Sequence, residues 1–193
     1  MLHTFTDIHT HTPGRPGSIL SVPAEGIDAV VASNSALPPG EGQYYSLELH
    51  PWHLTQGSID AFLSALEHHV ADPHFVAIGE CGLDGLCTTP ADLQLAAFRT
   101  ALQAAHRLGK PVIIHCVRQW SQLIAECRPY LAPTPTLSAK PAPPFIIHGF
   151  RKGPGLAKQL LREGFSLSLG KHYHPDVLPL IPPHRLYHET DED

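Results

Sequence analysis

The segment FVAIGECGLDGLCTTPADLQLAAFRTALQAAHRLGKPVIIHC, residues 75–116, contains two kinds of pattern in succession. Residues 75–81 and 111–116 are short runs rich in Val, Ile and Phe, a composition that favours β-strands. Between them, residues 91–109 repeat apolar side chains every three or four positions and end on Gly109, which is typical of an α-helix. The segment therefore predicts a strand, a helix and a second strand.

The same alternation continues on both sides of this segment. Six further runs have the composition of strands, at residues 3–9, 27–33, 44–50, 144–150, 165–170 and 185–191. Helical patterns lie between several of them, at residues 58–71, 120–128 and 155–164. Eight strands interleaved with helices predict an α/β fold of the TIM type, a (β/α)8 barrel. An open doubly wound sheet is the alternative.

The outer helix layer of this barrel is predicted to be incomplete. Residues 12–26 and 34–43, which follow the first two predicted strands, are too rich in Gly and Pro for helices, and no helical pattern follows strand eight. Outer side chains of these strands, namely Phe5, Ile8 and Val30 or Val31, would then form an uncovered apolar flank. Either the two loops fold back over this flank or a second chain covers it as a homodimer. We expect the monomer.

Length and composition predict one domain, residues 1–193, with a substantial core, because 42% of the 193 residues are hydrophobic. No apolar run approaches the roughly 18 residues of a membrane span, and residues 1–7 lack the pattern of a signal peptide. We therefore expect a cytoplasmic protein without a membrane partner. The Pro-rich residues 131–144 are expected to form an extended loop within that domain.

Charge and cysteine spacing exclude some functions. A net charge of -5 argues against a protein that coats duplex DNA through a broad basic face, but not against an enzyme acting on nucleic-acid ends. The cysteines at 81, 87, 116 and 127 form no CxxC or zinc-ribbon spacing, so reduced thiols are expected.

Residue types that bind metal ions occur at the ends of five predicted strands. In a (β/α)8 barrel the chemistry collects at the C-terminal ends of the strands. The residues at these ends are His9 and His11 after strand one, Glu80 in strand four, His115 in strand five, His148 in strand six and Asp191 in strand eight. Five equivalent placements favour a metal site over a surface that is merely rich in histidine.

These residues are more ligands than one tetrahedral ion needs, so two ions bridged by a carboxylate is the economical interpretation. Glu80, central in the strand order, is the expected bridge. With Glu80 and His115 facing inward, strand alternation places Cys81 and Cys116 outward, against the helices. The pattern leaves zinc, manganese and magnesium open as the metal.

Six short motifs, taken as an ordered set, resemble those of the TatD family of metal-dependent hydrolases, in particular its shorter members. They are TDIHTH (6–11), LHPW (49–52), GECGLD (79–84), KPVIIHC (110–116), IIHGFRKG (146–153) and ETD (189–191). The resemblance spans nearly the whole chain. It implies a TIM-barrel metallohydrolase with phosphodiesterase or deoxyribonuclease activity that requires divalent cations.

The resemblance also implies roles for individual residues. His9 and His11 would bind one ion, His115 and His148 the other, and Glu80 would bridge the two. Asp191 would bind the first ion and act as the base for the attacking water, so that Asp191 and Glu80 are the expected catalytic residues.

The sequence departs from the family pattern at three places. Family members usually continue past ETD into a closing helix, whereas this sequence ends two residues after Asp191. Glu48 stands where the family usually has a small residue, and a buried carboxylate there needs a partner. The family's arginine after the strand-five histidine is replaced by Val117, with Arg118 one position later.

Four further residues are candidates for contact with substrate. His50 could contact substrate at the barrel mouth, or its HPW segment could form a turn with Trp52 packed on the rim. Arg118, Arg151 and Lys152 could bind a phosphate, or could be solvated loop charges. Asp7 and Asp84 are expected to support the ligands or the fold.

The sequence thus predicts a two-metal hydrolase that cleaves phosphoester bonds, with DNA ends or a small phosphodiester as the substrate. Two alternatives stay open. The same centre could hydrolyse a C–N or ester bond, as in amidohydrolases, because an activated water also attacks a carbonyl. The chain could also bind metal without turnover.

Overall fold

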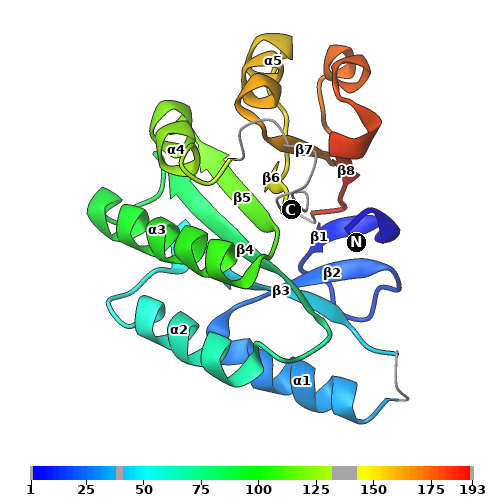
Figure 1. Cartoon of the computed structure of the whole chain (residues 1–193), viewed down its shortest axis with the longest axis vertical. Coiled ribbons are helices and arrows are strands. Elements are labelled where there is room, and N and C mark those ends of the chain that lie inside the picture. The colour runs from blue at the N-terminus through cyan, green and yellow to red at the C-terminus, as the bar shows by residue number, and fades with distance from the viewer. Residues whose placement is uncertain (1, 38–40, 132–142, 192–193) are drawn as a thin grey trace, which may run out of the picture.

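Eight parallel strands form the centre of the molecule in the computed structural model, which describes residues 2–37, 41–131 and 143–191 (Figure 1). They are β1 (Asp7–Thr10), β2 (Ser18–Val22), β3 (Tyr44–Leu49), β4 (Phe75–Asp84), β5 (Val112–Val117), β6 (Phe145–Ile147), β7 (Ser166–Leu169) and β8 (Leu186–His188). They pair in chain order without a crossover, and β8 also lies against β1. A doubly wound sheet would reverse its strand order, so this nearly closed barrel confirms the predicted TIM-type fold.

The helices surround the barrel as an incomplete layer. In the part of the chain that the structure describes, five α-helices follow strands β2 to β6 in turn: α1 (Ile27–Ser35), α2 (Ser58–His69), α3 (Ala91–Leu108), α4 (Trp120–Cys127) and α5 (Pro154–Glu163). Short 3₁₀ helices are η1 (Leu2–Thr4), η2 (Ala24–Gly26), η3 (Pro51–His53), η4 (Pro175–Leu180) and η5 (Pro183–Arg185). Within the described residues, only 3₁₀ helices follow β7 and no helix lies between β1 and β2, which confirms the incomplete layer. Residues 132–142 of the predicted Pro-rich loop lie outside the described residues.

The prediction for the second strand was wrong. Residues 27–33 lie in helix α1, and β2 is formed by residues 18–22, inside the segment predicted as a loop. Ile27, Val30 and Val31 have the three- and four-residue spacing of one helix face, which outweighs the strand preference of their β-branched side chains. The SILSV segment is buried on both sides between β1 and β3, where parallel pairing offsets its Gly-rich surroundings.

The predicted uncovered flank is therefore wrong as well. Ile8 is only 1% exposed and lies in a cluster with Ile113 and Ile146. Val30 and Val31 belong to α1 and pack against the core. The basis for a homodimer through this flank disappears, whereas the monomer stays a prediction.

The core is divided between the inside and the outside of the barrel. One cluster fills the barrel interior and comprises Leu2, Ile8, Ile19, Ala77, Ile113, Ile146 and Tyr187. Because Ile113 and Ile146 stand two residues before His115 and His148, alternate side chains of the same strands place this apolar cluster directly below the histidines. It closes the floor of the site.

The second and larger cluster lies between the strands and the helices. Cys81 is fully buried in it and Cys116 packs against it, as the alternation of the strands predicts. Burial raises the pKa of the Cys116 thiol to about 12, and all four cysteines are unpaired thiols. Among the described residues, no helix is both long and apolar enough to cross a membrane.

Gly82 is required where β4 passes close to β5. Its φ of +153° lies outside the range of most side chains, and a Cβ atom there would overlap the carbonyl oxygen of His115. We expect Gly82→Ala to lower the free energy of unfolding by about 2–5 kcal/mol, which is a fall in Tm of roughly 5–15 °C. Thermal melting followed by circular dichroism measures this.

Gly109 provides the matched control, because it ends α3 with a φ of +62° but has open space around it. Gly109→Ala should lower the free energy of unfolding by only about 1–2 kcal/mol, which is the cost of a left-handed backbone conformation for a residue with a Cβ atom. Equal melting temperatures of the two variants would contradict the close approach of β4 and β5.

Candidate metal centre

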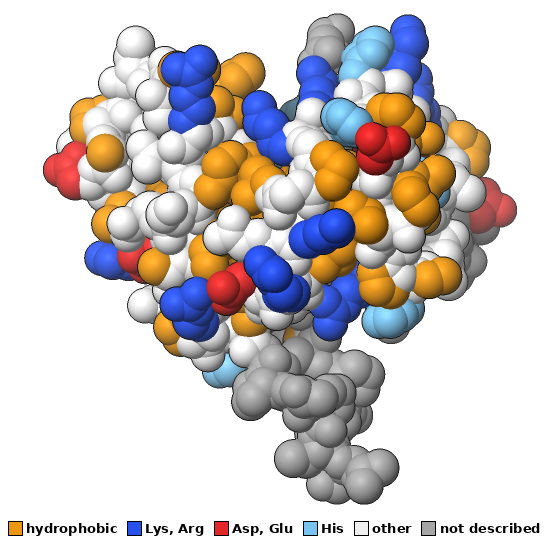
Figure 2. Space-filling model, turned by 90° about the horizontal axis from the view of Figure 1, so that it is seen from above, with side chains coloured by type: hydrophobic (Ala, Val, Ile, Leu, Met, Phe, Trp, Pro, Cys, Tyr) orange, Lys and Arg blue, Asp and Glu red, His pale blue; other side chains and the backbone are white. Residues whose placement is uncertain are grey.

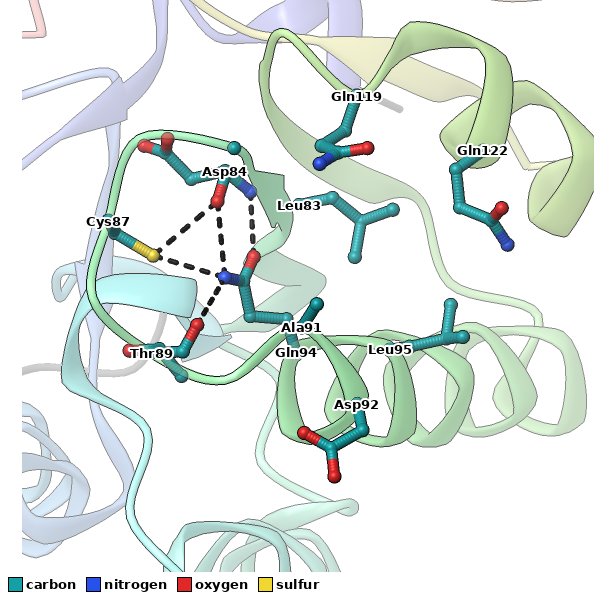
Figure 3. Close-up of a pocket in the computed structure, with 11 residues that line it drawn as sticks. Leu83, Asp84, Cys87, Thr89, Ala91, Asp92, Gln94, Leu95, Gln119 and Gln122 are labelled. Carbon is teal, nitrogen blue, oxygen red and sulfur yellow. Dashed lines mark hydrogen bonds between the residues drawn. The ribbon is translucent and has the colours of Figure 1, made fainter.

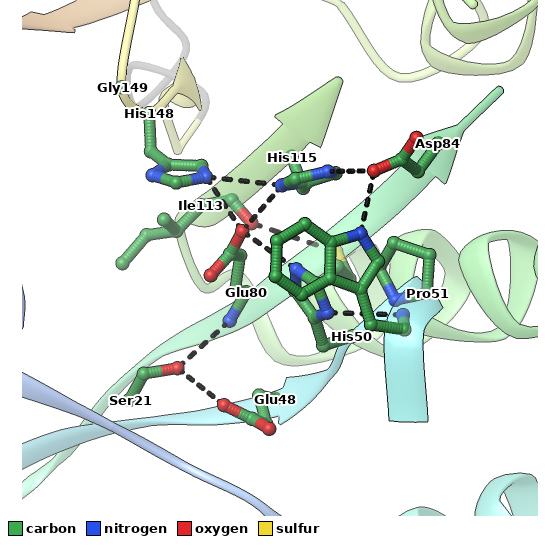
Figure 4. Close-up of polar contacts among 12 residues, drawn as sticks. Ser21, Glu48, His50, Pro51, Glu80, Asp84, Ile113, His115, His148 and Gly149 are labelled. Carbon is green, nitrogen blue, oxygen red and sulfur yellow. Dashed lines mark hydrogen bonds and ion pairs between the residues drawn. The ribbon is translucent and has the colours of Figure 1, made fainter. Parts of the chain in front are cut away.

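The Glu80 carboxylate lies at the centre of a group of imidazoles at the C-terminal end of the barrel. It is only 3% exposed, and its two oxygens face different histidines. Oε2 lies 3.1 Å from Nε2 of His9 and 3.8 Å from Nε2 of His11. Oε1 lies near three other rings: Nδ1 of His115 at 2.8 Å, Nε2 of His50 at 3.1 Å and Nε2 of His148 at 2.6 Å (Figure 4).

Asp191 reaches the same place from the segment that follows β8. Its Oδ1 lies 3.8 Å from Nε2 of His9, and its Oδ2 lies 3.8 Å from Nδ1 of His148. The backbone N–H of Asp191 donates to the carbonyl of His9, so this segment runs beside β1. The structure thus brings together all six side chains that the sequence proposes as ligands, while their roles stay predictions.

Three overlapping groups in the described chain have the donor atoms to hold an ion. They are His9 with His11 and Glu80, His9 with His148 and Asp191, and His50 with Glu80 and His115. His50 was expected only as a substrate contact, so its place among the donors is new. It directly follows β3, and the strand-end rule that identified the other histidines also applies to it.

The surroundings of His9 indicate whether this centre fits a metal ion. Its ring is fully buried, and neither imidazole nitrogen makes a hydrogen bond with the described residues, although Nε2 lies 3.1 Å from Oε2 of Glu80. Burying polar atoms without hydrogen bonds costs free energy, and a lone pair directed at a cation removes that cost. Imidazole and carboxylate donors suit divalent transition metals. The residues therefore fit a divalent cation.

Charge is strongly coupled within the centre. Burial raises the pKa of the Glu80 carboxyl, but His148, His115 and His50 outweigh this and hold it well below the usual value. Burial lowers the pKa of His148, but the carboxylates of Glu80 and Glu189 outweigh this and hold it well above the usual value. A metal ligand must be a neutral imidazole, so a cation would compete with the proton of His148.

Two further carboxylates lie at the far sides of the ligand rings. Oδ2 of Asp84 lies 3.1 Å from Nε2 of His115 (Figure 4), and Oε1 of Glu189 lies 3.7 Å from Nδ1 of His148. Carboxylates in these positions orient metal-binding imidazoles and raise their basicity. The sequence indicated Asp84 as a supporting residue. It missed Glu189, although this residue stands two positions before Asp191 in the same ETD motif.

Asp7 supports the main chain rather than a ring. Its Oδ1 accepts hydrogen bonds from the backbone N–H groups of His9 and Thr190, both at 3.2 Å. Its Oδ2 accepts from the Thr190 hydroxyl at 2.6 Å. Asp7 therefore ties β1 to the segment that carries Asp191.

Gln94, on α3, fixes the loop that carries Asp84. Its Oε1 accepts from the backbone N–H of Asp84 at 2.8 Å, and its Nε2 donates to the carbonyls of Asp84 at 3.1 Å and Thr89 at 2.8 Å (Figure 3). These residues line a second cavity of about 410 Å³ beside the centre. Gln94 thereby holds the main chain of Asp84, whose carboxylate in turn holds His115.

The metal-type ligands open into a pocket of about 480 Å³. Of the four expected substrate contacts, His50, Arg151 and Lys152 line it. Arg118 is exposed and does not line it, so the structure does not bring this residue to the centre. The guanidinium of Arg151 lies 3.9 Å from Oδ2 of Asp191, which places a positive charge at the pocket wall.

The chain is similar in sequence to a known protein family and to named bacterial proteins. The profile of the family described as TatD related DNase matches residues 24–192. The chain belongs to this family. A protein of Erwinia amylovora named 3'-5' ssDNA/RNA exonuclease TatD is 31% identical over 153 residues, which are 74% of this chain and 55% of that protein. A protein of the same name from Edwardsiella piscicida is 44% identical over 136 residues, 65% of this chain and 49% of that protein.

The chain spans about half the length of these curated relatives. Among solved structures, YJJV, a TatD homologue of Escherichia coli K12, matches with a TM-score of 0.74 and 26% identity over 99% of this chain and 80% of that one. A TatD family hydrolase of Entamoeba histolytica matches with a TM-score of 0.75 at 20% identity, over 97% of this chain and 73% of that one. The second similarity supports the fold alone.

Glu48, one of the departures from the TatD pattern, has a partner in the structure. Its Oε2 accepts a hydrogen bond of 2.8 Å from the hydroxyl of Ser21 on β2 (Figure 4). Glu48 is 8% exposed and lines the pocket, with its Oε1 3.8 Å from Nδ1 of His53. The partner that a buried carboxylate requires is therefore present.

Proposed function

We propose that this chain is a two-metal hydrolase that cleaves phosphodiester bonds at the ends of single-stranded nucleic acid. The observation that carries the proposal is the two-sided surrounding of Glu80, with His9 and His11 at one oxygen and His115, His148 and His50 at the other. The names of the bacterial relatives, which describe exonucleases of single-stranded DNA and RNA, support the choice of substrate.

The ligand set would divide between two ions, with Glu80 as a ligand of both. His9, His11 and Asp191 would hold one ion, and His115 and His148 the other, with His50 as a further donor. The overlap of the three donor groups at Glu80 and His9 supports two neighbouring ions. Zinc, manganese and magnesium are the candidate metals.

The cations would activate the water, and the chain's own residues would accept its proton and bind the substrate. Bound cations would lower the pKa of a water towards neutrality and stabilise the charge of the phosphate. Asp191 would accept a proton from this water, because its carboxylate lies at the pocket and close to both ligand groups. Arg151 and Lys152 would bind phosphate oxygens of the strand.

The net charge of -5 fits a substrate end rather than a long duplex. Lys and Arg side chains on the face shown in Figure 2 are spread among apolar and neutral ones and form no continuous band. Proteins that follow a duplex need such a band to neutralise several phosphates. The pocket of about 480 Å³ is within the size range of small-molecule sites, and so suits a terminal nucleotide.

The proposal is tested by comparing substrates with and without a chelator. Protein loaded with manganese, zinc or magnesium should hydrolyse bis-p-nitrophenyl phosphate and a single-stranded oligonucleotide, and the chelator should abolish both activities. Hydrolysis of acyl esters or amides in place of phosphodiesters would favour the amidohydrolase-like alternative. Metal retention without turnover of any substrate would favour a metal-binding protein. A cytoplasmic location and a monomeric state, both expected from the sequence, stay predictions.

A further inference from the structure

Both tryptophans of the chain line the pocket at the metal centre, and they differ in exposure. Trp52 is 58% exposed, although tryptophan is well buried on average. Trp120 is partly buried, packs against the core and meets the ring of Phe150 at a centroid distance of 6.5 Å. Trp52 is therefore the open aromatic surface of this pocket.

The exposed ring of Trp52 is held in a fixed orientation. Its Nε1 donates to Oδ2 of Asp84 at 2.6 Å. The ring also meets the imidazoles of His50 and His115 edge to face, at centroid distances of 5.1 and 5.8 Å. A ring that is already ordered loses little conformational entropy when a ligand stacks on it.

The strand order places Trp52 and the basic residues on opposite sides of the centre. Trp52 follows β3, whereas Arg151 and Lys152 follow β6. The two strands between them, β4 and β5, carry Glu80 and His115. An aromatic surface, a metal-type centre and a pair of cations therefore follow one another across the pocket.

We propose that Trp52 is the platform on which the terminal base of a nucleic-acid strand stacks, and that it selects ends with an unpaired base. This inference rests on the proposed function. A terminal base on Trp52 leaves the adjoining phosphodiester at Glu80 and the next phosphate near Arg151 and Lys152. Stacking tolerates every base, because each has an aromatic face, so the selection is for single-stranded ends rather than for sequence.

A different role for Trp52 must be separated from stacking. Its N–H bond to Asp84 could serve only to orient His115, since Asp84 contacts both side chains. Loss of that bond would slow hydrolysis of every substrate equally. Loss of stacking would slow only those substrates that carry a terminal base.

The test uses two single-stranded DNA oligonucleotides that differ only at the 3′-terminal nucleotide, which either carries its base or is abasic. The parent protein should prefer the base-bearing oligonucleotide in kcat/KM by about 5- to 100-fold. Trp52→Leu should bring this ratio close to one. Trp52→Phe keeps a ring but lacks the N–H, so it should retain most of the ratio even where its overall rate falls.

Leu86→Ala is the matched control, because Leu86 is 60% exposed and does not line the pocket. This variant should keep the parent's ratio. A parent ratio near one, or an unchanged ratio in Trp52→Leu, overturns the stacking platform while leaving the hydrolase intact. Absence of turnover of both oligonucleotides and of bis-p-nitrophenyl phosphate by the metal-loaded parent overturns the proposed function and this inference together.

Discussion

Glu80→Gln is expected to lower phosphodiester turnover by roughly a thousandfold or more and to remove most of the bound metal. The amide keeps the volume of the side chain but loses the charge that faces histidines on both sides. Glu80→Ala should have the same effect, because it removes the bridge altogether. Metal analysis by mass spectrometry after gel filtration and steady-state kinetics measure the two losses.

Glu126→Gln is the control for the loss of one carboxylate charge. Glu126 forms an ion pair with Arg99 on the outer helices, and neither residue lines the pocket. Its replacement should change neither metal content nor turnover, since the pair contributes no ligand and no pocket residue. Parent-like activity and metal content in a folded Glu80→Gln variant would show that Glu80 is not the shared ligand.

Asp191→Asn is expected to separate metal binding from turnover. The amide oxygen can still lie near a cation held by His9 and His11, but the side chain cannot accept a proton from water. We therefore expect turnover to fall by about 10²- to 10⁴-fold while most of the metal remains. Turnover and metal content are measured on the same preparation, so that a loss of turnover can be compared directly with any loss of metal.

Asp176→Asn makes the same chemical change at an exposed position in η4 and should leave both readouts unchanged. If Asp191→Asn is as active as the parent, the base lies elsewhere. Glu48 or a histidine would then accept the proton, since Glu48 lines the same pocket.

The barrel was predictable because most strands carry two independent features. A run such as PVIIHC combines strand composition with a metal-type ligand at its C-terminal end, and each feature supports the other. The second strand lacks this combination. SILSV stands among Gly and Pro and carries no ligand, whereas the Val-rich helix α1 has strand-like composition. Burial between neighbouring strands decides its conformation, and a single sequence does not display that burial.

The ligands at strand ends were predictable for the same reason, and Asp84 was expected as a supporting residue, but Gln94 and Glu189 were not predicted. Gln94 lies in the middle of an amphipathic helix, where a glutamine is normally solvated. It is buried and hydrogen-bonded to the main chain of Asp84 only because the loop after β4 passes over α3. Glu189 depends in the same way on where the segment after β8 meets β6. Such contacts arise from the closure of the barrel rather than from spacing along the chain.

The central claim is that two cations share Glu80, and anomalous diffraction from crystals grown with manganese tests it most directly. The account predicts two anomalous peaks about 3.5–4 Å apart, one beside His9 and His11 and the other beside His115 and His148, with the Glu80 carboxylate between them. A single peak on one side of Glu80, or peaks remote from its carboxylate, would contradict the account.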